Sequence, residues 1–477
     1  MLAALVCTPL LFALAALAVP SERLRPWLLP ACGLAHLALV VAALSGAAEP
    51  MAHGWLVLDQ LGRPVLGFLS VLFLVCALYA PGYLAQRPGR KNRVFCACVL
   101  AALGTLTLLV VAHHLGLMWV ALETTTLASA PLIYFNHNAR SIEATWKYLL
   151  IGSVGIALAL LGSFFLAYGA LRSGLPSTLV FEDLVRYAPQ ISKPWLHASF
   201  VLLLVGFGTK MGLAPMHSWK PDAYGEAPGL VGTLLAGGLT SGAFVAILRF
   251  FHICNAAGDG EFARQLLIAL GLLSMAVAGV FMVRQRDFKR MLAYSSVEHM
   301  GILVLGIGIG GEAVFGSLLH LVNNGLCKAV LFLSAGNIHR AFGSKRTEHV
   351  SGALRRVPGS AALFLAGFFA ITGSPPFGPF MSELTIVRGA FGTGHYAVGA
   401  AFLFFLFVIF IGMGATVLGV VQGDPPEGAP ETGIRDRFST LAPIVLALGM
   451  VLLLGVYIPE PVDRLLRDAA SFLEVQP

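Results

Sequence analysis

Charged side chains are scarce in this sequence. Asp, Glu, Lys and Arg make up 12% of its 477 residues and hydrophobic residues make up 57%. An ordinary soluble protein has about 25% charged residues, so this composition excludes a typical soluble globular protein. It predicts instead a polytopic membrane protein of the all-α class, because helices satisfy their own backbone hydrogen bonds in lipid.

Cysteines are also few, and they form no familiar metal-binding pattern. The seven cysteines lie in or beside apolar runs, and only Cys96 and Cys98 are close in sequence, at a spacing that matches no standard zinc or cluster motif. The sequence contains no Walker A run and no long soluble domain. We therefore expect packing roles for the cysteines, no cofactor or metal in this chain, and an energy source in another subunit.

Apolar segments of spanning length follow one another along the chain. A helix needs about 20 residues to cross a bilayer, and we expect about fourteen such helices. Their expected extents are 2–19, 26–48, 64–85, 94–112, 115–135, 145–170, 196–217, 228–251, 263–283, 291–310, 312–338, 358–381, 396–421 and 439–458. The first run has neither a basic region before it nor a small-residue cleavage site after it, so it is interpreted as a retained helix.

Basic residues are unevenly distributed among the loops. The loops after odd-numbered helices hold about 19 Lys and Arg, and the remaining loops with the C-terminal tail hold about 8. Because cytoplasmic loops are enriched in Lys and Arg, we expect both termini to lie outside the cytoplasm, with the chain in a bacterial or archaeal cell membrane. Orientation also accounts for the net charge of +7, so no nucleic acid partner is expected.

Glycine and proline interrupt two of the expected helices at corresponding places. Helix seven is interrupted at Gly212 and Pro215, and helix twelve, five helices later, within Gly373–Pro379. A unit with an odd number of crossings inverts the copy that follows it, and paired interruptions are typical of transport sites on discontinuous helices. We predict two inverted five-helix repeats with helices seven and twelve discontinuous. A packing kink at each proline is the alternative.

These repeats divide the chain into four expected segments. They are an N-terminal three-helix segment (1–93), a first repeat of helices 4–8 (94–255), a second repeat of helices 9–13 (256–421), and a segment with a cytoplasmic loop, the last helix and the C-terminal tail (422–477). The polar loop 422–439 contains three prolines and is expected to be flexible.

Ionisable residues occur at membrane depth in both halves. A lysine at the bilayer centre costs about 2.5–3.5 kcal/mol on insertion scales, so such residues mark transport paths by default. The candidate proton-transfer residues are Glu123, Lys147, Lys210, His217, Glu298, His299, His320, Lys328 and Glu383. A buried carboxylate and a buried ammonium stay charged only when partnered, so Glu123 is the predicted counterion of Lys210.

Some of these residues have simpler interpretations. Lys147 lies four residues after Glu143 near a helix end, where an exposed pair with a snorkelling lysine is an equal alternative. His320 can be a hydrogen-bonded core histidine, and Glu298 can be a helix-terminus charge. The combination of residues is more specific than any one of them.

Several motifs resemble one known family over about residues 55–420. The motifs are Glu123, Lys210 with Ala214–Ala223, Glu226–Pro228, Gln285–Gly301 and Lys328. The sequence resembles the antiporter-like subunits of respiratory complex I, of Mrp cation/proton antiporters and of group 4 hydrogenases. Within this family the runs Ser295–Gly301 and Ser374–Glu383 look most like the component F type of hydrogenase-4 subunit.

The resemblance implies a proton-translocating membrane subunit of a multisubunit redox complex. Its partners would be other membrane subunits and a peripheral redox arm, and it would have no redox cofactor of its own. By position, Glu123 and Lys210 match the family's ion pair, Lys328 its central lysine, and Glu383 its terminal ionisable residue.

The sequence departs from the family pattern at two positions. Ser241 stands where many relatives place a lysine, histidine or asparagine, and Asn324 stands where they usually have histidine. Neither side chain titrates, so the connection is expected to run through water held by Thr240, Ser241 and Asn324. The alternatives are a cation/proton antiporter, a proton-coupled inorganic carbon uptake subunit, and a structural membrane subunit that does not conduct.

Overall fold

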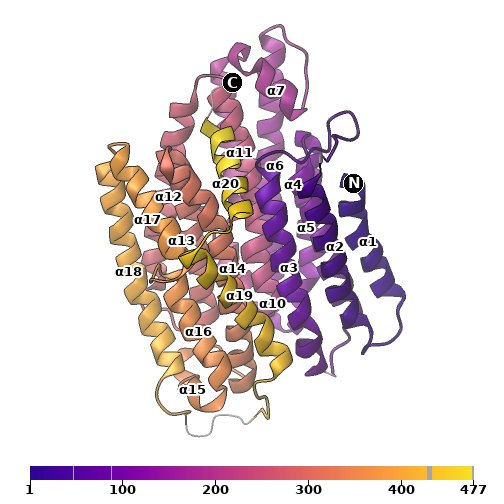
Figure 1. Ribbon diagram of the computed structural model, residues 1–477, viewed down its shortest axis with the longest axis vertical. Coiled ribbons are helices and arrows are strands. Elements are labelled where there is room, and N and C mark those ends of the chain that lie inside the picture. Colours follow the sequence, from indigo (N-terminus) through magenta and orange to yellow (C-terminus); the bar gives the residue numbers. More distant parts are fainter. Residues whose placement is uncertain (47, 88, 427–431, 475–477) are drawn as a thin grey trace.

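The protein is a bundle of long helices that run side by side (Figure 1). The computed structural model describes residues 1–46, 48–87, 89–426 and 432–474, and the extended pairings among them are isolated bridges. The short helices α7 (Phe181–Tyr187) and α15 (Ala353–Arg356) lie at opposite ends of the bundle in Figure 1. We call the end with α15 the basic end, because Arg87 and Arg90, which follow α3, and Lys345 and Arg346, which follow α14, lie there. The fold is all-α, as the composition predicts.

The first half of the chain contains the helices up to α11. They are α1 (Leu2–Ala18), η1 (Arg25–Trp27), α2 (Leu28–Ser45), α3 (Gly62–Ala85), α4 (Arg93–Val111), α5 (Leu115–Ile133), η2 (Tyr134–Asn136), α6 (Ala139–Arg172), α7, η3 (Ala188–Gln190), α8 (Lys193–Met211), α9 (Trp219–Glu226), α10 (Gly229–Thr233), η4 (Leu234–Leu239) and α11 (Thr240–Ala256).

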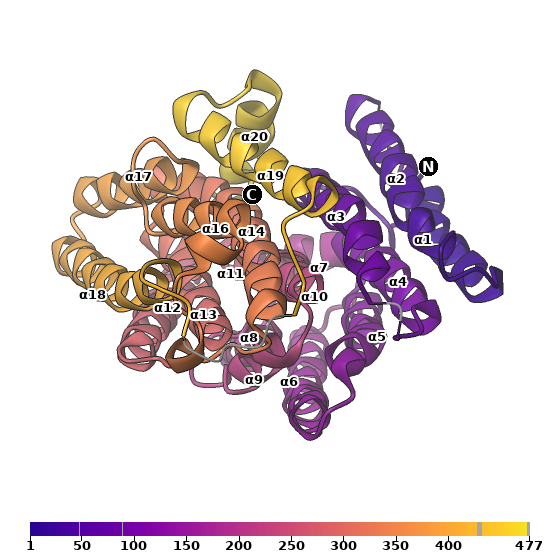
Figure 2. The same cartoon turned by 90° about the horizontal axis from the view of Figure 1, so that it is seen from below.

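The second half is built in the same manner. Its helices are α12 (Gly260–Met282), α13 (Phe288–Ile309), α14 (Glu312–Phe342), η5 (Thr347–His349), α15, α16 (Pro358–Ile371), α17 (Gly378–Gly392), α18 (Tyr396–Val421), α19 (Phe438–Val456) and α20 (Glu460–Glu474). Seen along the bundle, α14 lies near the centre and α18, α6 and α1 lie at the periphery (Figure 2).

Eleven helices of the described residues are long and apolar enough to cross a membrane, by length and composition. This confirms an all-helical polytopic membrane protein, whereas the expected number of about fourteen spanning helices is not confirmed. The three expected spans outside the eleven correspond to α1, which has 17 residues, and to two stretches that the structure interrupts, α8 with α9 and α16 with α17. Part of the proline-containing loop 422–439, residues 427–431, lies outside the described residues.

Non-helical segments interrupt these two stretches where glycine and proline predict it. α8 ends at Met211, and Gly212 follows with φ of 84°. α16 ends at Ile371, and Gly373 lies shortly after it with φ of 68°. Glycine adopts positive φ without a Cβ clash, and the prolines that follow have no N–H with which to continue a helix. Each interruption therefore follows from local sequence.

Two features of the helices are not evident from hydropathy. η4 is a π-helical turn between α10 and α11, and such turns are frequently found at functional sites. α20 is an amphipathic helix in the part of the chain that we expected to be a tail. Its buried residues Leu466, Ala469 and Leu473 recur every three or four positions, and that spacing would have predicted it.

A buried ion pair connects the loop before α3 to α11. The Arg249 guanidinium donates to Asp59 from Nε to Oδ2 at 3.1 Å and from Nη2 to Oδ1 at 3.0 Å, and it also donates to the carbonyls of Ala112 and Val110 at 2.8 and 2.6 Å. Burial raises the pKa of Asp59, but the charge of Arg249 opposes this and holds the pKa below its usual range. The pair is therefore ionised at neutral pH.

We expect Asp59→Asn to destabilise the fold by about 3–5 kcal/mol, because it leaves the Arg249 charge buried without a counterion. Since the pKa of Asp59 is depressed in the folded state, the pair's contribution is present above the unfolded pKa and is lost only as pH falls through the folded pKa. Thermal unfolding in detergent, followed with a thiol-reactive dye, should show the same loss at about pH 6 and pH 8. Asp468→Asn, on the exposed face of α20, is the control. Equal midpoints for the two variants would contradict the prediction.

Candidate functional site

The first predicted pair lies where α5 packs near the end of α8. The Glu123 Oε2 and Lys210 Nζ atoms are 3.7 Å apart, an ion-pair distance. Lys210 also donates a 2.6 Å hydrogen bond to the Thr126 hydroxyl, one helical turn from Glu123 on α5. The Lys210 side chain is fully buried, whereas 23% of the Glu123 side chain is exposed. The lysine thus has two oxygen partners on one face of α5.

Two other predicted residues of the first half do not join this pair. Lys147 lies near the start of α6, with 43% of its side chain exposed, and forms ion pairs with Glu143 at 2.6 Å and Asp222 at 2.8 Å. His217 lies in the segment between α8 and α9, and its Nδ1 atom is buried with no hydrogen-bond partner among the described residues. The Glu143–Lys147 pair is the exposed pair that was the alternative interpretation.

Lys220 is a buried lysine that we did not single out. Its side chain is fully buried on α9, and Nζ donates to the Met211 carbonyl at 2.7 Å and lies 3.5 Å from the Ser296 carbonyl. Because α8 stops at Met211, this carbonyl has no later helical N–H to accept from. In the sequence Lys220 lies among polar residues such as Ser218 and Asp222, so no apolar run marks it as buried.

Lys328 is buried on α14 and faces α13. Its Nζ donates a 2.8 Å hydrogen bond to the Ser295 hydroxyl, which neighbours the residue that Lys220 approaches. Two adjacent residues of α13, Ser295 and Ser296, therefore contact Lys328 of α14 and Lys220 of α9, respectively. The partner of Lys328 in the structure is therefore an uncharged group on another helix.

The four remaining acids and histidines of the second half form one buried cluster. His299 Nδ1 is 2.9 Å from His320 Nε2, and His299 Nε2 is 3.7 Å from Glu298 Oε2. Donor atoms of His299, His320 and Glu383 lie within 4.8 Å of one another, a set that can also bind a metal ion. Glu383 is 6% exposed, and its Oε1 has no hydrogen-bond partner among the described residues. The cluster brings α13, α14 and α17 together.

A hydroxyl extends this cluster within α17. The Ser382 Oγ atom is 2.9 Å from His320 Nδ1, so both ring nitrogens of His320 are in hydrogen-bond contact. Serine hydroxyls and neutral imidazoles can each donate and accept a proton. The arrangement can therefore pass a proton along His299, His320 and Ser382.

The three polar residues expected to hold water have different surroundings. The hydroxyls of Thr240 and Ser241 donate back to carbonyls four residues earlier, Ala236 at 2.6 Å and Gly237 at 2.5 Å, within or beside the π-helical turn η4. Asn324 is buried, and its Oδ1 has no partner among the described residues. Both hydroxyl oxygens keep acceptor capacity, and Asn324 offers a free acceptor.

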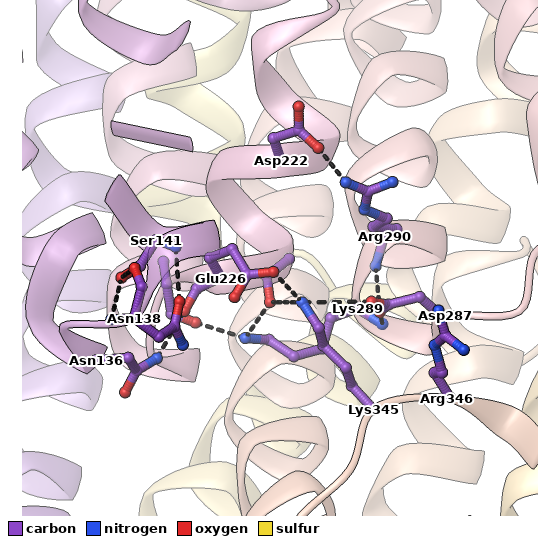
Figure 3. Close-up of polar contacts among 12 residues, drawn as sticks. Asn136, Asn138, Ser141, Asp222, Glu226, Asp287, Lys289, Arg290, Lys345 and Arg346 are labelled. Atoms are coloured by element: carbon purple, nitrogen blue, oxygen red, sulfur yellow. Dashed lines mark hydrogen bonds and ion pairs between the residues drawn. The ribbon is translucent and has the colours of Figure 1, made fainter. Parts of the chain in front are cut away.

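A second polar network closes the basic end of the bundle (Figure 3). Lys289 donates to the carbonyls of Gly225 and Ala227 at 3.0 and 2.5 Å, and Lys345 donates to the Gly225 carbonyl and to Glu226 Oε1 at 2.9 and 2.6 Å. Asp287 caps α13 through the backbone N–H of Lys289. These contacts fix the C-terminal end of α9, the helix that carries Lys220.

The chain is similar in sequence to known membrane proteins. A family model described as NADH:quinone oxidoreductase/Mrp antiporter, TM, matches residues 112–412. The hydrogenase-4 component F homolog of Methylacidiphilum infernorum (isolate V4) is 32% identical over 431 residues, which cover 87% of this chain and 88% of the relative. NADH-quinone oxidoreductase subunit N of Desulforudis audaxviator (strain MP104C) is 30% identical over 502 residues, with 98% and 97% coverage.

The structure is similar to solved chains as well. A chain of the membrane-bound sulfane sulfur reductase, an archaeal respiratory membrane complex, superposes with a TM-score of 0.88 at 22% identity, covering 99% of this chain and 97% of that one. At this identity the likeness shows a shared fold.

The interruption after α8 generates a stability prediction. A Cβ on Gly212 would lie 2.5 Å from the Lys220 side chain, on a backbone with φ of 84°. Gly258 has φ of 75° but no atom within 4 Å of its Cβ position, so it is a matched control. We expect Gly258→Ala to lose only the backbone term of about 1–2 kcal/mol, and Gly212→Ala to lose more. The measurement is the thermal unfolding midpoint of each variant. Equal midpoints would contradict the prediction, because they would show that the Lys220 side chain moves away from the new Cβ with no loss of stability.

Proposed function

Because the chain belongs to the NADH:quinone oxidoreductase/Mrp antiporter membrane family, we propose that it is the proton-translocating subunit of a multisubunit redox complex of hydrogenase-4 or NADH:quinone oxidoreductase type. The observation that carries this proposal is the series of buried ionisable side chains between Glu123 and Glu383. Isolated charges are costly at this depth, so a series of them is retained for transport.

We assign the residues of this series as follows. Glu123 and Lys210 form the pair of the first half, and Lys220 and Lys328 both contact α13. His299, His320 and Glu383 form the far end. Hydroxyl groups of Thr126, Ser295 and Ser382 contact its members. Protonation of one lysine raises the free energy of the protonated form of the next lysine, since like charges repel strongly in a low dielectric.

The central part of the path is proposed to use water. Water held by Asn324, with Thr240 and Ser241 as acceptors, would connect the lysines to the histidines. Glu298 lies beside His299 and would accept a proton from it. We place His217 at the opening of the first interruption and Lys147 at the basic end, where exposure supports roles in entry.

The two interruptions support a proposed internal symmetry. Gly212 faces Lys220 in the first, and Gly373 faces the Glu383 carboxylate in the second. In each case a positive-φ glycine makes room for a buried ionisable side chain of the helix that follows. We propose that the two units, 94–255 and 256–421, are inverted repeats, preceded by the segment 1–93 and followed by 422–477. When each interrupted stretch counts as one crossing, the proposed arrangement has the fourteen crossings expected from about 20 residues per span.

The proposed partners are other membrane subunits and a peripheral redox arm. Moving one charge against 100 mV costs about 2.3 kcal/mol, which a redox reaction in a partner can supply. The proposed location is the cytoplasmic membrane with both termini outside, since the basic loops then face the cytoplasm. No cofactor within this chain is required for that role.

We expect Lys328→Ala to abolish proton translocation and to leave electron transfer in the partner subunits partly intact. The amine is the titratable group between the lysines of the first half and the histidine cluster, and replacing it with a methyl group removes a costly buried charge. Proton pumping and redox turnover are measured together in vesicles that contain the intact complex. Proton translocation by the parental complex is also measured without sodium ions, because a sodium/proton antiporter would lose transport under that condition.

Two further variants sharpen this test. Lys193→Ala removes a lysine whose side chain is 64% exposed, and it should leave the proton-to-electron ratio unchanged. Ser295→Ala removes the hydrogen-bond partner of Lys328 but keeps the amine, so an intermediate loss is expected. The parental ratio in Lys328→Ala would show that protons bypass this residue.

A further inference from the structure

A hollow of about 560 Å³ opens at the basic end of the bundle. Five of its lining side chains are cationic, namely Arg87, Arg90, Arg140, Lys345 and Arg346, and one is a carboxylate, Glu226. The lining residues come from the loop after α3, η2, the start of α6, the end of α9, the end of α14 and the loop after α14. Chain segments far apart in sequence therefore direct positive charge toward one space.

The carboxylate does not neutralise this space. Glu226 Oε1 accepts a 2.6 Å hydrogen bond from Lys345, so the lysine balances its negative charge. The positive charges of the four arginines are not balanced by this carboxylate. Arg87 and Arg90 donate to the side-chain and backbone oxygens of Asn136, at 3.0 and 2.8 Å, and the Arg87 guanidinium also lies over the Tyr83 ring, 4.9 Å from its centroid. Within the described ranges no carboxylate lies at ion-pair distance from the guanidinium groups of Arg140 or Arg346.

Other basic residues of the same end are paired. Arg290 and Lys147 both contact Asp222, Arg286 contacts Glu348 at 3.0 Å, and Arg355 contacts Asp424. The general enrichment of Lys and Arg on one side of a membrane protein accounts for the presence of these residues. It does not account for the convergence of unneutralised arginines on one hollow.

Polar groups around the hollow complete an anion-binding environment. The 34-residue helix α6 begins there, with Asn138 as its N-cap, and a helix N-terminus carries partial positive charge. Figure 3 labels five of the lining residues, namely Asn136, Asn138, Glu226, Lys345 and Arg346. Arginine forks match the oxygen geometry of phosphate groups, which they bind in bidentate fashion.

We propose that this hollow is a binding site for a phosphate group, in the form of a phosphate monoester, a phosphate diester or inorganic phosphate. The group is held by Arg140 and Arg346, with Arg87, Arg90 and the N-terminus of α6 contributing positive potential. The site is separate from the proposed proton path and does not depend on it. A lipid headgroup and a soluble phosphate share this chemistry, and the experiment separates these two sources.

The test measures binding directly on the purified complex in detergent. The probes are inorganic phosphate, dihexanoyl phosphatidylglycerol and, as an anion without phosphate, hexaglutamate. The variant is Arg140→Gln with Arg346→Gln, whose side chains are both exposed and whose loss should not unfold the protein. Arg172→Gln, at the opposite end of α6, is the matched control.

We expect saturable binding of at least one phosphate probe, at least tenfold weaker in the double variant and unchanged in Arg172→Gln. Binding of phosphatidylglycerol alone assigns the site to a lipid headgroup, and binding of inorganic phosphate assigns it to a soluble phosphate. The proposal is overturned if neither phosphate probe binds, if hexaglutamate alone binds, or if the double variant and Arg172→Gln behave alike.

Discussion

A lysine amine inside a membrane-embedded bundle must be surrounded by oxygen atoms, and this requirement organises the interior of the protein. Lys210 is held by a hydroxyl and a carboxylate of α5, Lys220 by the last carbonyl of α8, and Lys328 by a hydroxyl of α13. In each case the oxygen belongs to a different helix from the lysine. The same contacts that make the charges tolerable therefore fix α5, α8, α9, α13 and α14 relative to one another.

The interrupted helices provide part of what these charges need. A continuous helix has no spare carbonyl in its interior, whereas a helix that stops presents its last carbonyls to other donors. Lys220 uses one of them. At the second interruption the ionisable residue is an acid, Glu383, and it lies among histidines instead of carbonyls. The two halves thus place ionisable side chains of opposite type, a base and an acid, beside similar interruptions.

Much of this arrangement could be predicted from sequence, for physical reasons. An ionisable residue with apolar sequence on both sides is conspicuous, so Lys210, Lys328 and their depth were predictable, as was the approach of Glu123 to Lys210. Lys220 was not singled out, because it follows a proline-containing segment with polar neighbours and its burial depends on how α9 folds back. The contact of His299 with His320 depends on the packing of α13 against α14, which periodicity does not specify.

The Glu123–Lys210 pair is unequal in its access to the surroundings. The amine is enclosed by the protein, whereas nearly a quarter of the carboxylate side chain lies on the outer surface of an isolated chain. The medium that touches this surface fixes the local dielectric, and the attraction between two charges varies inversely with it. A neighbouring subunit that covers α5 would replace this medium and thus change the strength of the pair without touching the lysine, so assembly itself would set the affinity of the first half for its proton.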